Sequence, residues 1–151
     1  MATITTYSHG VPQEEAAGLS AGYCVNGTIY ISGQMSHDMQ GAFVGAGDIE
    51  AQTRQTLENL DRVLTGFGVT RTNIAELQIY MVDPQAHHAQ YNPLVKQYLG
   101  DHRPAATLIG VASLPGGPQQ LIEIRAVAYP GSREGRTWTA SSTARCSAEF
   151  P

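Results

Sequence analysis

The segment Leu121–Ala128 (LIEIRAVA) restricts the fold more than any other part of the chain. Its even-numbered positions are all apolar, whereas the odd-numbered positions include Glu123 and Arg125. Successive side chains of a strand point to opposite faces of a sheet, so we expect helices to cover the even face alone. The odd face, left without a helix, then carries Leu121, Glu123, Arg125 and Val127. A sheet covered by helices on one side belongs to the α+β class.

Two amphipathic helices are predicted before this segment. The first begins after Asp48, whose carboxylate suits an N-cap, and ends at Gly68. The second begins at Asp83-Pro84 and ends at Gly100. Apolar residues at helical spacing define the buried stripes, which are Leu57, Leu60, Val63, Leu64 and Phe67 in the first helix and Tyr91, Leu94, Val95, Tyr98 and Leu99 in the second.

Strands are predicted on both sides of these helices. Asn26-Gly27 tolerates positive φ and centres a hairpin within Gly22–Ser32, which a Gly-rich loop, Gly33–Gly47, follows. Residues alternate between two faces along Ile74–Val82, the segment that separates the two helices, and this pattern predicts a strand. A strand over Thr107–Leu114, a turn at Pro115–Pro118 and a strand over Gln120–Tyr129 complete the order. The order ββαβαββ, with short hairpins, predicts a mixed sheet with both helices on one face.

The chain length favours one domain. Its 151 residues match the usual size of a single domain, which we place at residues 1–130. Residues 131–151 lack periodicity and are rich in Ser, Thr, Arg and Gly, so we expect a tail that is not an independent domain, with Trp138 as its anchor. Cys24 and Cys146 form no CxxC pair and are expected to be free thiols.

Charge and hydropathy exclude several classes of protein. The net charge of -4 disfavours nucleic acid as a partner. The chain has no apolar run of about 18 residues and no signal-peptide pattern, so we expect no membrane partner and a cytoplasmic location. Charged residues make up 15% of the chain, below the average of about 25%, which hints at a surface covered in an oligomer.

Glu123 and Arg125 share the face without a helix and allow two interpretations. As an exposed ion pair they would contribute about 0 to 1 kcal/mol to stability. If this face packs against other subunits, Glu123 is partly desolvated and can orient a water molecule or exchange a proton. The pattern alone does not choose between them.

Other polar motifs carry weaker signals. Adjacent side chains on a helix point about 100° apart, so the predicted helix cannot present His87 and His88 to one metal ion. His37 and Asp38 lie in the Gly-rich loop, where they could reach a ligand, but polar loop residues are usually solvated and we expect the same of these two. No phosphate loop or nucleophilic triad is recognisable around the remaining candidates, which are Gly41, Gly45, Gly47, Ser32, Ser113 and Cys24. We therefore expect neither a metal nor another cofactor.

Several motifs together resemble the RidA/YjgF family. They are IYISGQMS, the helix start IEAQTRQTLENL, the strand end YMVD, RPAATLIGVASL and IEIRAVAY, which together cover about Leu19–Tyr129. The resemblance implies a chorismate-mutase-like fold, a homotrimer with a central β-barrel, and ligand clefts between subunits. The activity that it implies is hydrolysis of reactive imines and enamines such as 2-aminoacrylate, which gives a 2-keto acid and ammonia.

The resemblance also implies site residues. Glu123 matches the glutamate that holds the attacking water, Gly33 a glycine whose backbone lines the cleft, and Asn92 a cleft asparagine. The arginine that binds the substrate carboxylate is replaced by Ala106, so a bidentate clamp is missing there. Arg103 and Arg125 are candidate replacements. The remaining cleft positions implied are Leu19 in place of a tyrosine, Thr107 with its backbone N–H, and Leu108 where a cysteine is common.

The leading hypothesis is a divergent hydrolase of an imine, enamine or related C–N intermediate, larger or less acidic than 2-aminoacrylate. A pathway-specific isomerase or cyclase fits the same class. The alternative is a trimer that binds a small molecule or regulates a partner without turnover, because the clamp is lost at Ala106. Ribonuclease activity, another label of the family, is disfavoured because the sequence has no basic stripe with interleaved aromatic residues.

Overall fold

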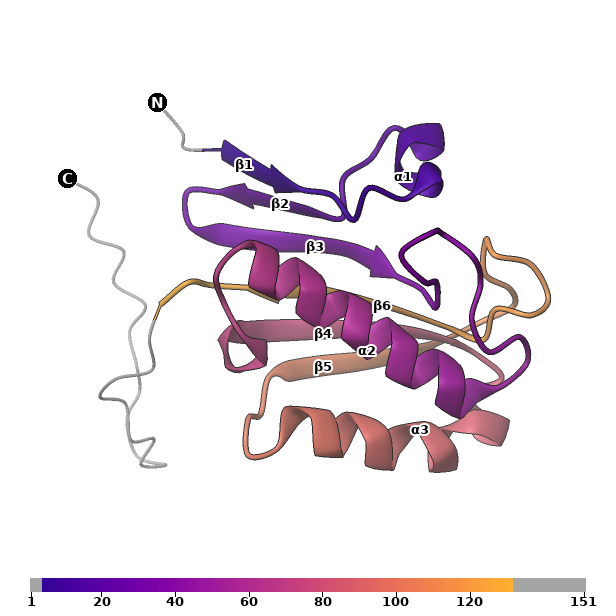
Figure 1. Cartoon of the computed structure of the whole chain (residues 1–151). Coiled ribbons are helices and arrows are strands. Elements are labelled where there is room, and N and C mark those ends of the chain that lie inside the picture. The colour runs from indigo at the N-terminus through magenta and orange to yellow at the C-terminus, as the bar shows by residue number, and fades with distance from the viewer. Residues whose placement is uncertain (1–3, 132–151) are drawn as a thin grey trace, which may run out of the picture.

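The computed structural model describes residues 4–131, which form one six-stranded mixed sheet with two long helices packed on one face (Figure 1). In chain order the elements are β1 (Ile4–Tyr7), α1 (Pro12–Ala17), β2 (Gly22–Val25), β3 (Thr28–Gln34), α2 (Ile49–Gly66), a 3₁₀ turn (Arg71–Asn73), β4 (Ile74–Val82), α3 (Pro84–Leu99), β5 (Ala105–Val111) and β6 (Ile122–Ala128). The predicted α+β class is confirmed. None of the helices in the described part is long and apolar enough to cross a membrane.

Both long helices begin where the capping residues predict. The Asp48 carboxylate accepts hydrogen bonds from the backbone N–H groups of Glu50 (3.0 Å) and Ala51 (3.1 Å). Asp83 caps α3 through the N–H of Ala86 at 3.2 Å. The apolar stripe of α2 is buried, and Leu60, Val63 and Leu64 are 0% exposed. The core therefore lies between the helices and one face of the sheet.

The strand order is β1-β2-β3-β6-β4-β5, so the last strand lies in the middle of the sheet. β6 is antiparallel to both of its neighbours, and β5 is parallel to β4 at the edge. The prediction that the last two strands form a hairpin is therefore wrong. A parallel pair needs a crossover connection, and α3 provides it between β4 and β5. β5 lies at the edge of the sheet, so β6 pairs with the other side of β4.

The strand boundaries and the orientation of one side chain, Leu121, differ from the sequence prediction. β3 extends through Gly33 into the expected loop, β5 ends at Val111, and β6 begins at Ile122. Leu121 precedes β6 and is buried in the core, where its N–H donates to Gln52 Oε1 at 2.8 Å. The alternation holds from Ile122 onward, because the even residues of β6 are at most 1% exposed. The face of the sheet opposite the helices, called the open face below, carries the Glu123, Arg125 and Val127 side chains.

The N-terminal segment contains two elements that the sequence did not predict. β1 pairs with β2, and the six-residue α1 lies near the end of β3 (Figure 1). Both elements are too short to show periodicity, which explains why the pattern missed them. Cys24 is a free thiol. Trp138, Cys146 and the rest of the expected tail after Gly131 lie outside the described residues.

Candidate functional site

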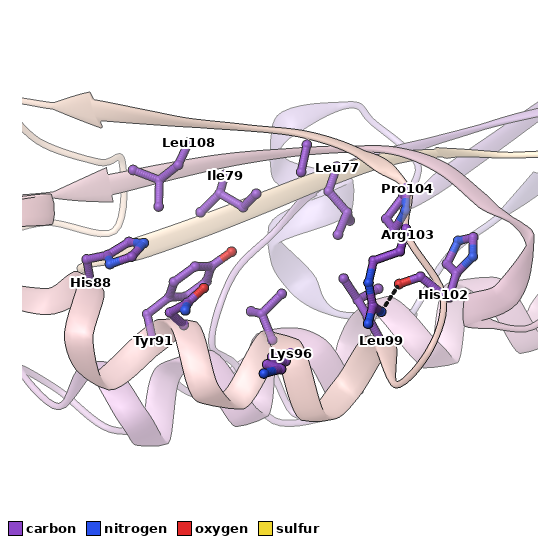
Figure 2. Close-up of a pocket in the computed structure, with 13 residues that line it drawn as sticks. Leu77, Ile79, His88, Tyr91, Lys96, Leu99, His102, Arg103, Pro104 and Leu108 are labelled. Atoms are coloured by element: carbon purple, nitrogen blue, oxygen red, sulfur yellow. Dashed lines mark hydrogen bonds between the residues drawn. The ribbon is translucent and has the colours of Figure 1, made fainter. Parts of the chain in front are cut away.

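The site residues implied by the family resemblance fall into two separate pockets. Leu19, Gly33 and Glu123 line a pocket at the ends of β3 and β6, called the Glu123 pocket below. Asn92, Ala106 and Leu108 line a second pocket between α3 and strands β4 and β5, called the α3 pocket (Figure 2). Thr107 and Arg125 line neither of these two.

The Glu123 pocket combines apolar walls with a few polar groups. Its volume is about 480 Å³. It lies beside the point where β3 shifts register against β6, between Ile31 and Gln34. The apolar walls consist of Val11, Ala17, Leu19, Ala21, Met35, Phe43 and Pro115, and the titratable groups are His9, Glu14, His37 and Glu123. This composition is typical of a small-molecule site.

The Glu123 carboxylate is held against a glycine. A Cβ added to Gly33 would lie 1.9 Å from Glu123 Oε1, so only a residue without a side chain leaves room for the carboxylate there. On the other side Gln120 Nε2 donates to Glu123 Oε2 at 3.3 Å. Gln120 is itself anchored, because its Oε1 accepts the N–H of Gly116 at 2.6 Å. Gly33 and Gln120 together fix where the carboxylate lies.

Glu123 is partly desolvated and has no cationic partner among the described residues. Burial raises the pKa of its carboxyl above the ordinary value, and the hydrogen bond from Gln120 partly opposes this rise. Arg125 Nη1 instead donates to Gln78 Oε1 at 3.1 Å, so the surface ion pair considered from the sequence does not form. A carboxylate in this state is a stronger base than an exposed one.

Two histidines lie in the same pocket, contrary to the expectation of a solvated His37. His37 is only 8% exposed, and the His9 ring packs edge-on against it with centroids 5.5 Å apart. His9 Nε2 is 2.8 Å from Gln34 Oε1. No sequence signal placed His9 here, because only the tertiary fold brings the N-terminal segment to the loop after β3.

A buried carboxylate supports this N-terminal segment. Burial disfavours the charged form of Glu14, but hydrogen bonds from the Ser8 hydroxyl and the backbone N–H groups of His9 and Gly10 hold its pKa below the ordinary value. Glu14 therefore remains ionised and ties the start of α1 to the turn before it. This turn places His9 in the pocket wall.

The α3 pocket has a volume of about 390 Å³ and lies on the helix-covered side of the sheet. Figure 2 shows His88, Tyr91 and Lys96 on α3, with Ile79 and Leu108 on the strands beside them. Arg103 sits at one end, where its Nη1 donates to the His102 carbonyl at 2.9 Å. His88 lines this pocket and remains exposed.

Strand register explains why the two pockets are separate. Ala106 and Leu108 pair with Leu77 and Ile79 of β4, whose side chains are buried under the helices. Thr107 pairs with Gln78 on the opposite face, where Gln78 also binds Arg125. A single chain thus holds Glu123 on one face of the sheet and Ala106 on the other. Leu19, Ala106 and Leu108 do not form one continuous apolar wall within it.

Comparison with known proteins gives one consistent picture. A family model described as Endoribonuclease L-PSP matches residues 4–130. A RutC family protein of Pyrococcus horikoshii is 34% identical over 67% of this chain and 78% of its own length. The human 2-iminobutanoate/2-iminopropanoate deaminase is 34% identical over 71% of this chain and 76% of its own.

Solved structures agree with this picture. Yeast Mmf1 matches with a TM-score of 0.75 and 26% identity, over 84% of this chain and 98% of its own. A member of the YjgF/YER057c/UK114 family from Mycobacterium tuberculosis matches with a TM-score of 0.74 and 27% identity, over 84% of this chain and 99% of its own. The RidA/YjgF resemblance is confirmed, and the chain belongs to the Endoribonuclease L-PSP family, which includes the RutC and YjgF proteins.

Proposed function

We propose that the protein hydrolyses an imine or enamine to a carbonyl compound and ammonia, with Glu123 as the base that activates water. The observation that carries this proposal is the Glu123 carboxylate itself. It is desolvated, has no ion-pair partner among residues 4–131, and is fixed against Gly33 at the wall of a pocket. The naming of several relatives as imine deaminases supports the same chemistry.

The hydrolytic step needs a base beside the attacking water. Glu123 accepts a proton from water as the water oxygen forms a bond to the imine carbon, and the C=N electron pair moves to nitrogen, which takes a proton from an acid in the pocket to give an amino alcohol. The proton held by Glu123 then passes to the amine nitrogen, the hydroxyl proton returns to the group that acted as the acid, and the C–N bond breaks to release ammonia. A backbone N–H near Gly33 is suited to orient the substrate, and the N–H of Thr107, which lines neither pocket of its own chain, would have to come from a neighbouring subunit.

The substrate we propose is larger or less acidic than 2-aminoacrylate. Ala106 offers no cation, and Arg125 is bonded to Gln78. Arg103 donates to the backbone carbonyls of Gly100 and His102. Lys96 also lines the α3 pocket, but an ammonium is a point charge and does not form the bidentate fork of a guanidinium. The apolar walls of the Glu123 pocket favour a ligand with an apolar body.

We further propose a homotrimer in which each site is shared between two subunits. The open face exposes apolar rings, with Tyr23 and Tyr30 at 40% and 46%, and the edge strand β5 exposes Ile109 at 37%. Covering these side chains would account for the low charge content. A neighbouring subunit could then bring its Ala106 side of the α3 pocket to Glu123.

The other parts of the proposal are a small-molecule partner, no nucleic-acid or membrane partner, a cytoplasmic location, and a tail outside the domain. The negative net charge argues against nucleic acid. The family match ends at residue 130, which supports the boundary between residues 1–130 and 131–151.

The loss of the clamp at Ala106 favours a second candidate function, a binding trimer without turnover. Both candidates share the same pocket, so ligand binding alone does not separate them. Only release of ammonia and a carbonyl product does.

The test is a screen of imines generated in place by amine and amino-acid oxidases, with ammonia and carbonyl product followed. On an imine that the protein turns over, Glu123→Gln should lower kcat by about 10²- to 10⁴-fold. The control is Glu76→Gln, which alters a carboxylate on β4 that lines neither pocket. Because burial raises the pKa of Glu123, the acid limb of the parent's rate should lie above the ordinary carboxyl range.

The outcomes separate the two functions. A Glu123→Gln rate within threefold of the parent's would contradict the role of Glu123. Binding without turnover in both forms would establish the binding trimer instead.

A further inference from the structure

The loop after β3 holds His37 in a fixed position in the Glu123 pocket. Asn59 of α2, 0% exposed, donates from its Nδ2 to the carbonyls of Met35 and His37, at 2.9 Å each. The Asp38 carboxylate accepts the N–H groups of Gln40 and Ala42, also at 2.9 Å. These hydrogen bonds therefore hold the loop so that His37 stays in the pocket wall.

The hydrogen bonds of His37 determine its tautomer. Nδ1 lies 2.8 Å from the backbone carbonyl oxygen of Asp38, and because a carbonyl only accepts, Nδ1 must carry the proton. In the neutral ring Nε2 then bears the lone pair, and in the protonated ring it carries the second N–H. It has no hydrogen-bond partner among residues 4–131, and it is not one of the buried unpartnered atoms, so it remains accessible. Since His37 lines the Glu123 pocket, Nε2 is the ring nitrogen left to exchange a proton with a ligand there.

The neighbouring His9 has the opposite arrangement. Gln34 Nε2 donates to the Ser32 carbonyl, so Gln34 Oε1 accepts and His9 Nε2 carries the proton. His9 Nδ1 is buried without a partner, and burial lowers the pKa of this imidazole below its ordinary value. His9 thus stays neutral and supports the ring of His37 rather than exchanging protons with a ligand.

We propose that His37 is a second proton-transfer residue of this pocket. Its Nε2 donates a proton to the substrate nitrogen while Glu123 accepts a proton from water. This inference rests on the proposed imine hydrolysis and deepens it. An imidazole whose Nδ1–H is held by a carbonyl presents Nε2 as the atom that can accept or donate a proton, which is the geometry of a general acid–base residue.

The proposed roles balance the reaction. Imidazolium Nε2–H donates a proton to the imine nitrogen as Glu123 takes one from water and the C–O bond forms. Imidazole then returns to its neutral form. In the second half, the proton held by Glu123 passes to the amine nitrogen, the hydroxyl proton passes to His37, and the C–N bond breaks. Imine and water become carbonyl compound and ammonia, and both residues regain their starting states.

The test compares His37→Gln with His87→Gln. Glutamine keeps a hydrogen-bonding side chain but does not exchange protons, and His87, on α3, lines neither pocket. The probe is the imine of phenylpyruvate, generated from phenylalanine by an amino-acid oxidase, because its aryl group suits the apolar walls. His37→Gln should lower kcat by about 10- to 100-fold with KM within threefold, and His87→Gln should change neither.

Two further readouts separate proton transfer from a structural role. The alkaline limb of kcat against pH should disappear in His37→Gln, and added imidazole should restore part of the turnover of His37→Ala but not of Glu123→Gln. The titratable groups that line the pocket with His37 are His9, Glu14 and Glu123, Asp38 is its neighbour in the chain, and Arg62 acts on His9. Because His9 stays neutral, the same profile recorded on His9→Gln should keep its alkaline limb.

Each outcome decides the inference. Turnover by the parent that survives His37→Gln, with an unchanged pH profile, overturns this inference alone. An alkaline limb lost in His9→Gln instead assigns the proton transfer to His9. Absence of turnover by the parent, on this probe and throughout the imine screen, overturns the proposed function and the inference together.

Discussion

Glu123 and Gly33 depend on each other at the scale of single residues. The carboxylate occupies the space that any side chain at position 33 would need, with Oε1 at 1.9 Å from the position of an added Cβ. The atom that must move is the end of a flexible side chain, not backbone. A methyl group at this position should therefore disturb the chemistry far more than the fold.

Gly33→Ala should lower kcat by about tenfold or more, because a displacement of about 1 Å in a reacting group costs up to about 10²-fold. Its free energy of unfolding should change by less than about 1 kcal/mol. Kinetics on an imine that the parent hydrolyses, together with urea unfolding, measure both quantities. Gly131→Ala is the control, since an added Cβ there meets no atom within 4 Å. Full activity in Gly33→Ala would show that the carboxylate position is not critical.

Ala106→Arg should gain affinity for small carboxylates such as pyruvate by about 10- to 100-fold, since a hydrogen-bonded charged pair contributes about 1.5 to 3 kcal/mol. Ala105→Arg places the same guanidinium on the opposite face of β5 and should gain nothing. Calorimetric titration measures both. Equal affinity in the parent would mean that another cation, Arg103 or Arg125, already acts as the clamp.

At the residue scale the sequence predicted Glu123 and missed the histidines for different reasons. Glu123 is a charged residue on the odd face of an alternating strand, which is a local signal. His9 and His37 are 28 positions apart and meet only because β1 and α1 fold over the end of β3. Their tautomers depend on carbonyl and amide partners that no spacing rule encodes.

At the scale of elements, α2 does more than bury an apolar stripe. Its buried face also carries Gln52 and Asn59, both 0% exposed. Gln52 Nε2 donates to the carbonyls of Gly45 (2.8 Å) and Gln119 (2.7 Å), and Asn59 holds the loop with His37. These amides satisfy loop carbonyls that would otherwise be buried without partners, so α2 shapes the pocket wall.

Asn59→Ala should lower the free energy of unfolding by about 1 to 3 kcal/mol, because two carbonyls lose their donor. For a chain of this size the Tm should fall by about 2 to 4 °C for each kcal/mol. Thermal unfolding measures this, and hydrogen exchange should rise in the loop around His37. Gln55→Ala removes only a bond to Asn59 Oδ1 and serves as the control. An unchanged Tm in Asn59→Ala would show that the loop is held by other contacts.

The elements that were predicted well are those with local signals. Asp48, Asp83 and Gly100 mark helix ends through contacts with their immediate neighbours, so the boundaries of α2 and α3 followed from the sequence. The pairing of β5 with β4 and the central place of β6 depend on residues far apart in the chain. The strand–turn–strand pattern around Pro115–Pro118 therefore suggested a hairpin. The crossover through α3 instead pairs β5 with β4, which lies between β5 and β6.

At the scale of the whole molecule, one subunit does not bring the proposed site together. Glu123 lies on the open face, and Ala106 lies under α3 on the other face. The proposed trimer joins them across an interface. Light scattering should give the mass of three chains at micromolar concentration, and a monomer would remove the shared site.

Mixed trimers test the central claim most directly, because they ask whether Glu123 acts in a site completed by another subunit. Glu123→Gln removes the base, and Ala106→Trp fills the other half of the shared cleft. We predict that each homotrimer is inactive on an imine that the parent hydrolyses. Random 1:1 mixing should restore about a quarter of the parent's activity, since about one interface in four pairs two intact halves. Activity no greater than the sum of the two homotrimers would contradict the account.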